Sequence, residues 1–367
     1  MEQDVIIIGA GIIGLATAES LLMHGAKVTI LDRNLAGHES SWAGGGILSP
    51  LCPWHYSDAV TQLTSYSAKK FPEWAAALYS STGIDPEFWI SGMRILPPHE
   101  TKVALDWCNQ RGINIQQCVP TQEIINTTDS TVQTQKDHTL LLPDIAQIRN
   151  PRLLQALHSR VLQLGGKIIE KCKVENFQHT HERIRSIDTT FGQLTADYFI
   201  ICAGAWTSEI LGTSALKLRI RPIKGQMLLF KFDNPPVSNI LVQEDLYIIP
   251  RQDGHVLIGS TVEDTGFDKQ VTHLARENLF KRALSILPAL QEKLVILHWA
   301  GLRPGSPDNL PTIAPHPNIR NLFVNSGHFR YGVTMAPASA EIMMNYLLNS
   351  PQPMDITPYQ TGWHENP

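Results

Sequence analysis

Residues 4–32 constrain the fold most strongly, because they combine a buried-strand pattern, a glycine turn and a helix pattern in one short unit. Val5–Ile8 is an unbroken apolar run, which is typical of a strand covered on both faces in a parallel sheet. The run Gly9-Ala10-Gly11-Ile12-Ile13-Gly14 follows directly, and a stripe of Leu and Ala over 15–22 predicts a helix. Val28–Leu31 predicts a second strand, so the stretch is expected to form one βαβ unit.

The three glycines of this turn stand where a dinucleotide-binding turn needs them. Gly9 permits the tight turn, Gly11 lets the backbone approach a pyrophosphate, and Gly14 lets helix and strand pack closely. The helix N-terminus offers free N–H groups to phosphates. Asp32, at the end of the second strand, suits ribose hydroxyls and disfavours a 2′-phosphate, while Arg33 is expected in solvent or near adenine. A glycine turn that serves only packing is the alternative.

Length and composition narrow the class of protein. At about 150 residues per domain, 367 residues predict two domains. The net charge of −4, without runs of like charge, does not favour nucleic acid or an anionic membrane as partner. Five cysteines without a CxxC pair argue against a disulfide framework or a metal site. The acidic, glycine-interrupted N-terminus and the lack of long apolar runs predict a cytoplasmic protein without stable membrane association.

Hydrophobic periodicity predicts further elements along the chain. Asn150 is expected to cap a helix that has Pro151 at its first position, and Gly165-Gly166 should end it. Other predicted helices cover 61–80, 100–111, 271–287 and 335–348, and predicted strands cover 167–174, 183–189, 198–202, 294–301 and 322–325, with a strand-rich section over 219–262.

Two further glycine-rich stretches indicate a second flat ring system in the ligand. Ser40–Leu48 has glycines where a backbone must lie against a ligand. Asn325–Gly332 joins a predicted strand to a predicted helix, whose N–H groups would point at an electron-rich ligand edge. Each cluster alone is more often a simple turn, but together with the N-terminal unit they favour FAD over NAD.

These residues resemble the FAD-dependent D-amino acid oxidase family, and within it the glycine oxidases of thiamine biosynthesis. The resemblance covers essentially the whole chain. Beyond the stretches above, it rests on the runs Cys202-Ala203-Gly204-Ala205-Trp206, Tyr247-Ile248-Ile249-Pro250-Arg251, Trp299-Ala300-Gly301-Leu302-Arg303-Pro304-Gly305 and Gly327-His328-Phe329-Arg330.

The resemblance implies an α/β fold with a Rossmann-like FAD-binding domain of the glutathione-reductase type and an inserted antiparallel-sheet α+β substrate domain. The predicted FAD-binding domain comprises 1–86, 147–215 and 300–367, and the substrate domain 87–146 and 216–299. The predicted cofactor-binding residues are Gly9, Gly11, Ile12, Ile13, Gly14, Asp32, Arg33, Ser40, Ser41, Gly45, Gly46, Ile47, Val174, Ala203, Gly204, His328, Phe329, Arg330, Tyr331, Gly332, Val333 and Thr334.

The resemblance also assigns a substrate site. Arg303 matches the arginine that binds the substrate carboxylate, which a guanidinium fork holds bidentately while staying charged. Arg330 matches a second substrate-contacting position, and Tyr247 the tyrosine over the pocket; a satisfied strand tyrosine is the alternative for Tyr247. His328 is assigned to flavin contacts rather than a base role, because a neutral amine needs no base for hydride transfer.

Two further features bear on substrate and cofactor. Asp245 and Val262 stand where a known glycine oxidase has pocket residues histidine and methionine, which leaves substrate breadth open. No cysteine follows Cys202, so FAD is expected to be non-covalent. Residues 50–57, with Trp54 and Tyr56, are either a lid or an ordinary loop.

The predicted reaction is oxidative deamination of glycine, with sarcosine and small D-amino acids as further substrates, to a 2-oxo acid, ammonia and hydrogen peroxide. The imine of glycine would serve thiazole formation, which implies a link to thiazole synthase, and a homo-oligomer is expected. The alternatives are a broad D-amino acid oxidase, a quinone-linked dehydrogenase, and a non-catalytic FAD-bearing scaffold.

Overall fold

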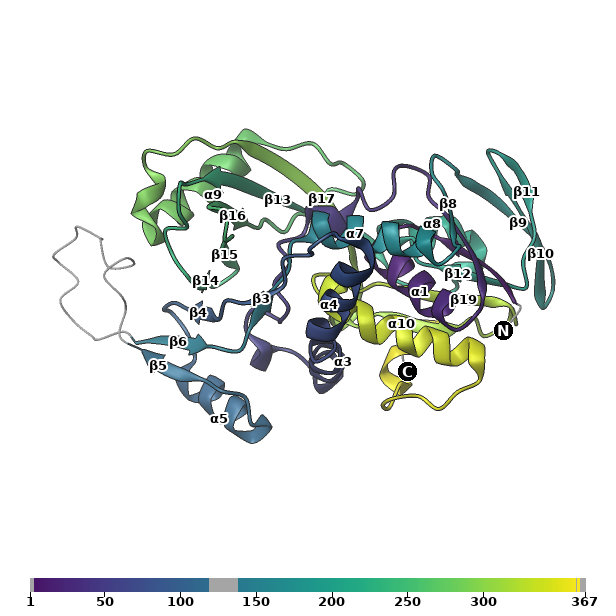
Figure 1. The fold of residues 1–367 in the computed structure, drawn as a ribbon, viewed down its shortest axis with the longest axis horizontal. Coiled ribbons are helices and arrows are strands. Elements are labelled where there is room, and N and C mark those ends of the chain that lie inside the picture. The colour runs from purple at the N-terminus through teal and green to yellow at the C-terminus, as the bar shows by residue number, and fades with distance from the viewer. Residues whose placement is uncertain (1–2, 119–137, 361, 364–367) are drawn as a thin grey trace.

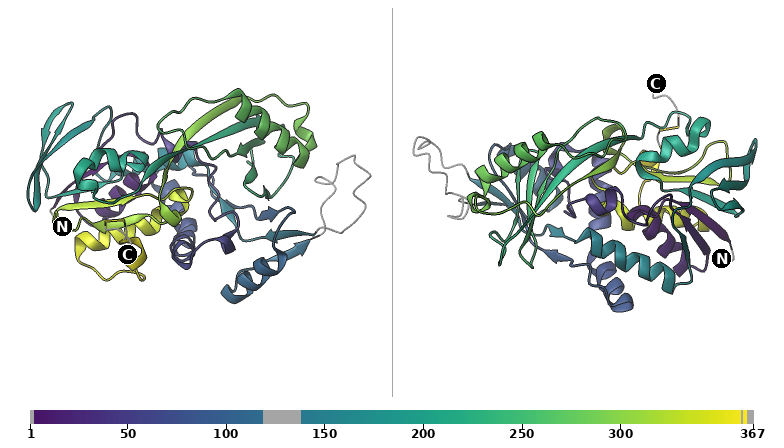
Figure 2. Two further views of the ribbon diagram at one scale, coloured as in Figure 1. Left: turned by 180° about the vertical axis from the view of Figure 1, so that it is seen from behind. Right: turned by 90° about the horizontal axis from the view of Figure 1, so that it is seen from above.

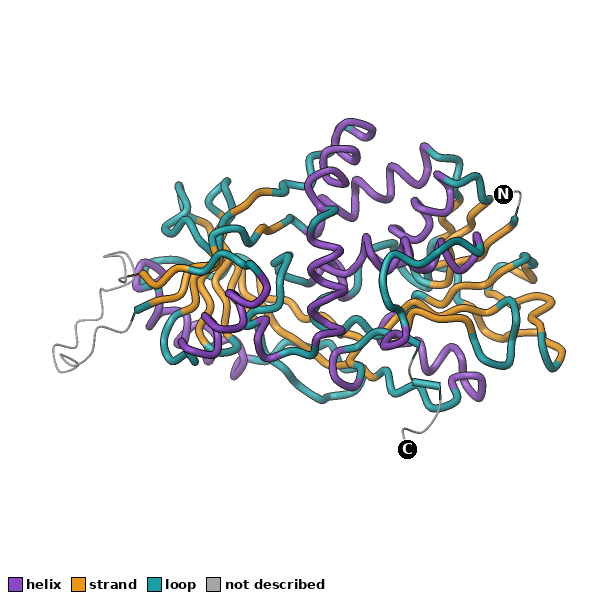
Figure 3. The backbone as a smooth tube through the Cα atoms, turned by 90° about the horizontal axis from the view of Figure 1, so that it is seen from below, coloured by secondary structure: helices purple, strands orange, loops and turns teal. Residues whose placement is uncertain are grey.

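The computed structural model describes residues 3–118, 138–360 and 362–363, arranged around two large sheets at opposite ends of an elongated molecule (Figure 1). Figure 2 shows the same two-part arrangement from behind and from above. In Figure 3 the strands gather in two groups, with helices packed around the middle and one end. Among the described residues, no helix is long and apolar enough to cross a membrane.

The first sheet has six strands in the order β18-β19-β12-β1-β2-β8, parallel except for β18 at its edge. Its strands are β1 (Asp4–Ile8), β2 (Lys27–Leu31), β8 (Lys167–Ile169), β12 (Tyr198–Ile201), β18 (Thr312–Pro315) and β19 (Leu322–Ser326). Val5 and Ile7 of β1 face a helical layer, and Ile6 and Ile8 face the opposite layer. The unbroken apolar run therefore fills both faces, as the sequence predicts.

Helices and a small sheet cover these two faces. The helical layer contains α1 (Ile12–Met23), α3 (Asp58–Ala68), α4 (Phe71–Thr82), α7 (Asn150–Gln163) and α10 (Gly332–Leu348). The other face packs against a three-stranded antiparallel sheet of β9 (Val174–Thr180), β10 (Arg183–Thr189) and β11 (Gly192–Leu194), and next to the short helix α8 (Thr207–Leu211).

The second sheet has eight strands in the order β17-β13-β16-β15-β14-β4-β6-β5, all antiparallel except the β14–β4 pair. Its strands are β4 (Met93–Ile95), β5 (Gln116–Cys118), β6 (Thr139–Leu142), β13 (Arg221–Lys231), β14 (Ile240–Gln243), β15 (Leu246–Pro250), β16 (His255–Gly259) and β17 (Leu297–Gly305). Helix α9 (His273–Ile286) packs on this sheet, α5 (Thr101–Arg111) lies near its β5–β6 edge, and β3 (Trp89–Ile90) pairs with β7 (Ala146–Gln147).

The predicted fold class, a parallel sheet combined with an antiparallel one, is confirmed. The βαβ unit and the helix over 100–111 are also confirmed. Strand β17 runs through the predicted boundary at residue 300 and continues in the antiparallel sheet to Gly305. The domain boundaries themselves stay a prediction.

Three element predictions are wrong in detail. The single helix over 61–80 is two helices, because the ring of Pro72 would clash with the Ala68 carbonyl and so ends α3 there. The strand over 167–174 is divided between β8 and the start of β9, which belong to different sheets. Asn150 does not cap α7: it is the first helical residue, and its side-chain amide donates to the Ser41 carbonyl at 2.8 Å.

Candidate active site

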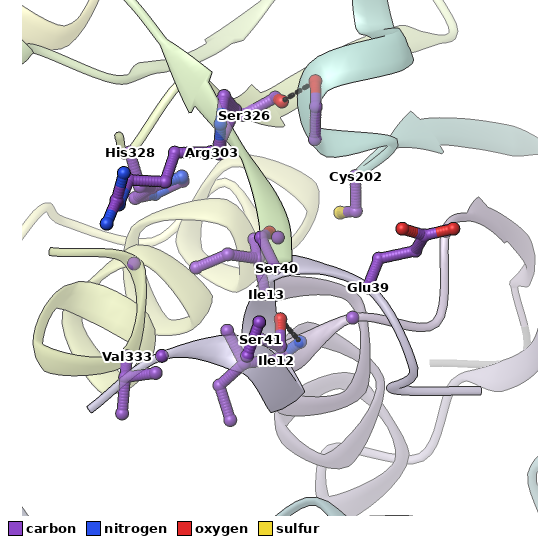
Figure 4. Close-up of a pocket in the computed structure, with 18 of the residues that line it drawn as sticks. Ile12, Ile13, Glu39, Ser40, Ser41, Cys202, Arg303, Ser326, His328 and Val333 are labelled. Atoms are coloured by element: carbon purple, nitrogen blue, oxygen red, sulfur yellow. Dashed lines mark hydrogen bonds between the residues drawn. The ribbon is translucent and has the colours of Figure 1, made fainter. Parts of the chain in front are cut away.

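The glycine turn after β1 is shaped by close backbone contacts. A Cβ on Gly9, whose φ is +111°, would lie 2.4 Å from the Cys202 carbonyl oxygen. A Cβ on Gly14 would lie 1.9 Å from the Gly9 carbonyl oxygen, so only glycine lets α1 approach β1 this closely. At the start of α1, the Ile12 N–H donates to Ser41 Oγ at 2.9 Å (Figure 4). This helix N-terminus opens onto a cavity and offers it donors for an anion.

One cavity gathers the residues that the sequence singles out. Every predicted cofactor-binding or catalytic residue lines it except Gly14, whose place is between helix and strand. Figure 4 shows Arg303 and His328 together at one end and Glu39 at the other, with Ile12, Ile13 and Ser41 between them. The cavity therefore extends from the βαβ unit to the strand β17 that carries Arg303.

Asp32 and Arg33 lie at the end of the cavity next to β2. The Asp32 carboxylate accepts the Ala10 N–H and the Asn34 N–H, both at 2.8 Å. Burial raises the pKa of Asp32, and these backbone hydrogen bonds oppose the rise. A carboxylate has about four acceptor sites, so two bonds leave capacity for ribose hydroxyls. The Arg33 guanidinium is 3.8 Å from the Trp206 ring centre and 3.6 Å from Glu39.

The short helix α2 (Ser40–Ala43) and the glycines after it form a fixed wall of the cavity. The buried guanidinium of Arg251 donates to the Gly45 carbonyl at 2.8 Å and to the Ile148 carbonyl at 3.0 Å. Trp299 Nε1 donates to the Ala43 carbonyl at 3.1 Å, and Thr334 Oγ1 to the Ile47 carbonyl at 3.1 Å. Side chains of three distant elements thus hold this wall in place.

Glycine at position 45 lets this wall pack closely against the side chains of β15. A Cβ on Gly45 would lie 2.6 Å from Ile249 Cδ1 and 3.2 Å from the Tyr247 ring. Next to this wall, the N-terminus of α10, which starts at Gly332, also borders the cavity and presents the positive end of a helix dipole. Two helix N-termini, a carboxylate with free acceptor capacity and a glycine wall fit the phosphates, adenosine half and ring system of FAD.

Arg303 is a half-buried cation that lies on the backbone of β13. A Cβ on Gly225 would lie 2.2 Å from both Nη atoms. The guanidinium donates to Ser260 Oγ at 2.6 Å and to the Thr261 carbonyl at 3.2 Å, and burial lowers the pKa of Arg303. Within the described part of the chain, no carboxylate lies within 4 Å of it. A cation held only by neutral oxygens, in a cavity, is prepared for an anionic ligand.

Tyr247 and Arg330 lie near this cation. The Tyr247 ring covers Gly259, where a Cβ would lie 2.7 Å from the hydroxyl, and that hydroxyl is 3.7 Å from Met227 Sδ. Arg330 lies over the Phe329 ring at 5.3 Å and is near enough to Arg303 to oppose its charge. The site therefore combines two guanidinium groups and a phenol, which suits a small carboxylate.

His328 is unsuited to act as a base. Its side chain is buried, Nε2 lies 2.9 Å from Ser339 Oγ, and burial lowers its pKa to about 3. The imidazole is therefore neutral near pH 7 and tied to α10. A contact between His328 and the flavin stays a prediction.

Some sequence predictions do not match the site, and some site residues were missed. Asp245 and Val262 do not line the cavity: Asp245 pairs with Arg282 at 2.5 Å, and Val262 is 46% exposed. The missed lining residues Gly225 and Ser260 lie outside every motif, because their role depends on strand pairing with β17 and on the turn after β16.

The segment over 50–57 contacts the site at one end. Leu51 lines the cavity, and the Tyr56 ring meets the Tyr331 ring edge-on at 5.1 Å. Trp54 is buried within the segment. Both interpretations from the sequence, a lid and an ordinary loop, stay open for this segment.

Comparisons with known proteins show what the chain is similar to. A family model described as FAD dependent oxidoreductase matches residues 4–346. The chain is 38% identical to the glycine oxidase of Pseudomonas putida over 362 residues, 98% of each chain. It is 29% identical to the bifunctional protein ThiO/ThiG of Trichormus variabilis, covering 95% of this chain and 53% of that one. The crystal structure of glycine oxidase from Geobacillus kaustophilus matches with a TM-score of 0.92 at 24% identity, covering both chains fully.

Proposed function

Because the chain belongs to the family of FAD-dependent oxidoreductases, we propose that it is a glycine oxidase that converts glycine, dioxygen and water to glyoxylate, ammonia and hydrogen peroxide. The observation that carries the choice of substrate is Arg303, a cation in the cavity whose described hydrogen-bond partners are all neutral oxygens. An α-amino acid supplies the missing carboxylate, and Tyr247 and Met227 line the same cavity.

The residues that would hold FAD follow from the cavity. The N–H groups at the start of α1 would meet the pyrophosphate, Asp32 the ribose, and residues 45–47 with the start of α10 the ring system. When bound, the flavin accepts a hydride from the substrate Cα and delivers the electrons to dioxygen.

The chain's own groups orient the substrate for this chemistry. Arg303 binds the carboxylate through its fork, and Tyr247 closes the pocket over it and donates a hydrogen bond. Arg330 adds a second positive charge near the same carboxylate. The amine is bound neutral, so its lone pair can assist loss of the hydride without a protein base, which agrees with the low pKa of His328.

Partners and location follow from the same proposal. Because relatives exist in which the matching part is joined to a ThiG part, we propose that the imine formed from glycine serves thiazole formation. The five free cysteines suit a reducing cytoplasm. We also propose a homo-oligomer, which light scattering on the purified protein would measure.

A substrate panel tests the proposed function. Purified protein is given glycine, sarcosine and D-alanine under air, and hydrogen peroxide is measured. Peroxide release from glycine, with kcat/KM at least equal to that for D-alanine, is expected. A preference for larger D-amino acids would indicate a broad D-amino acid oxidase instead, and flavin reduction without peroxide would indicate a dehydrogenase.

A further inference from the structure

Lys224 is a buried ammonium group directly behind the candidate substrate site. It lies on β13, which runs between β16 and the Arg303 strand β17 (Figure 1). Its side chain is 2% exposed, and Nζ lies 3.1 Å from the Glu263 carboxylate and 3.7 Å from Asp268. Burying a lysine costs free energy even when it is paired, and the stability of a sheet does not require one at this position. Removal of one partner would leave an unpaired buried charge, so the pair constrains the positions of both segments that carry it.

The ion pair fixes the segment that leaves β16. The main chains of Lys224 and Glu263 also exchange two hydrogen bonds, of 2.8 and 2.9 Å. The Glu263 carboxylate in turn accepts Gln226 Nε2 at 2.8 Å and the Thr261 hydroxyl at 2.5 Å. Residues 260–263 are thereby held against β13 by side chains as well as by backbone.

This fixed segment supplies the oxygens that orient Arg303. Ser260 Oγ accepts from Nη2 at 2.6 Å, and the Thr261 carbonyl accepts from Nη1 at 3.2 Å. The Lys224 carbonyl lies 3.5 Å from Nη1. Since Gly225 leaves the guanidinium flat on β13, these oxygens decide which N–H groups of the fork stay free for a ligand.

We propose that Lys224 and Glu263 are positioning residues for substrate carboxylate binding, acting on Arg303 through Ser260 and Thr261. The inference rests on the proposed function, because it assigns a role in amino acid binding. A charge-assisted hydrogen bond weakens when its geometry is disturbed, so a loosened segment should weaken binding of a carboxylate by the Arg303 fork measurably.

The test compares neutral variants of this pair in the FAD-loaded protein. Lys224→Met and Glu263→Gln should each raise KM for glycine roughly tenfold, with kcat changed much less. Binding of acetate, followed by the change in flavin absorbance, should weaken by a similar factor, while the Kd for FAD stays within about twofold of wild type. In the double variant, KM for glycine should rise by less than the product of the two single-variant factors, because each substitution breaks the same ion pair.

A neighbouring exposed ion pair is the matched control. Arg221 lies three residues before Lys224 on β13 and pairs with Asp264, the residue after Glu263, with both side chains more than half exposed. Arg221→Met and Asp264→Asn should leave KM and acetate binding within about twofold of wild type. Ser260→Ala should weaken glycine and acetate binding as Lys224→Met does. Ser260→Thr keeps the hydroxyl and should therefore weaken binding less than Ser260→Ala.

The outcomes separate this inference from the proposed function. A folded, FAD-loaded Lys224→Met protein with unchanged KM and acetate affinity would overturn the inference, even if its melting temperature fell. If wild type fails to oxidise glycine, the proposed function falls, and acetate binding to the same variants still tests the link to Arg303.

Discussion

At the scale of single residues, the candidate site is marked by a cation that has no carboxylate partner and faces the cavity. Arg303 is bound by three neutral oxygens and faces the cavity, whereas Arg149, for example, pairs with the carboxylates of Glu87 and Asp253. A cation kept in this state is expected to gain most from a bound anion.

Arg303→Ala should therefore impair substrate use without loss of the cofactor. We expect FAD to stay bound and kcat/KM for glycine to fall by at least about 2 kcal/mol of transition-state stabilisation, or about 30-fold. Steady-state peroxide release and the flavin-to-protein absorbance ratio measure the two effects. Arg282→Ala, at an exposed ion pair outside the cavity, is the control. Kinetics close to wild type would remove Arg303 from the site.

His328 should make stability depend on pH. Burial lowers its folded-state pKa to about 3, below its ordinary value of 6.5, so between these values the unfolded chain binds the proton and the folded chain does not. Stability should therefore fall as pH drops from about 6.5 towards 3, by at most about 1.4 kcal/mol per pH unit from this group. Urea titrations at several pH values should show a weaker acid dependence for His328→Asn; an unchanged dependence would contradict the assignment.

At the scale of elements, the cavity wall depends on residues that tie separate elements together. Arg251, at the end of β15, donates to the Gln147 side chain of β7 and to the Ile148 and Gly45 carbonyls. Burial lowers the pKa of Arg251 to about 10, which leaves it charged near pH 7. Its position joins the antiparallel sheet to the glycine wall.

Arg251→Met should loosen that wall. Three acceptors would lose their donor, and we expect the Kd for FAD, measured by flavin fluorescence, to rise roughly tenfold, in line with loss of hydrogen bonds to a charged group. Arg152→Met is the control. Arg152 is more exposed and pairs with Glu87 at 3.2 Å, so its loss should leave FAD affinity unchanged. Equal changes in the Kd for FAD in both variants would mean that the hydrogen bonds of Arg251 do not hold the glycine wall in place.

The elements also show what the sequence could predict. Local patterns were sufficient for the βαβ unit and α5, since each depends on its own apolar period and end signals. The split of the predicted strand over 167–174 was not accessible, because β8 and β9 pair with strands far along the chain. Likewise, Ser260 and Lys224 belong to no motif, and only the pairing of β13 with β17 and the turn after β16 brings them to Arg303.

At the scale of the whole molecule, the two sheets contribute different parts of one reaction site. The six-stranded sheet carries the turn and helix ends that suit the phosphates, and the eight-stranded sheet carries Tyr247 and Arg303. None of the cysteines lines the cavity near Arg303; Cys172 and Cys202 border it next to β2 and β12.

FAD should therefore be released when the whole fold is lost. After denaturation of the purified protein and filtration, we expect the yellow colour in the filtrate and a colourless polypeptide. Flavin that stays with the polypeptide would show a covalent bond, contrary to the prediction from the sequence.

The central claim is that the protein recognises its substrate by the carboxylate that Arg303 binds. The most direct measurement is flavin reduction without oxygen, in which glycine is compared with methylamine, the same amine lacking the carboxylate. We predict that glycine bleaches the flavin absorbance with saturation and that methylamine at equal concentration does so at least about 100-fold more slowly. Equal bleaching by the two amines, or none by glycine, would contradict the account.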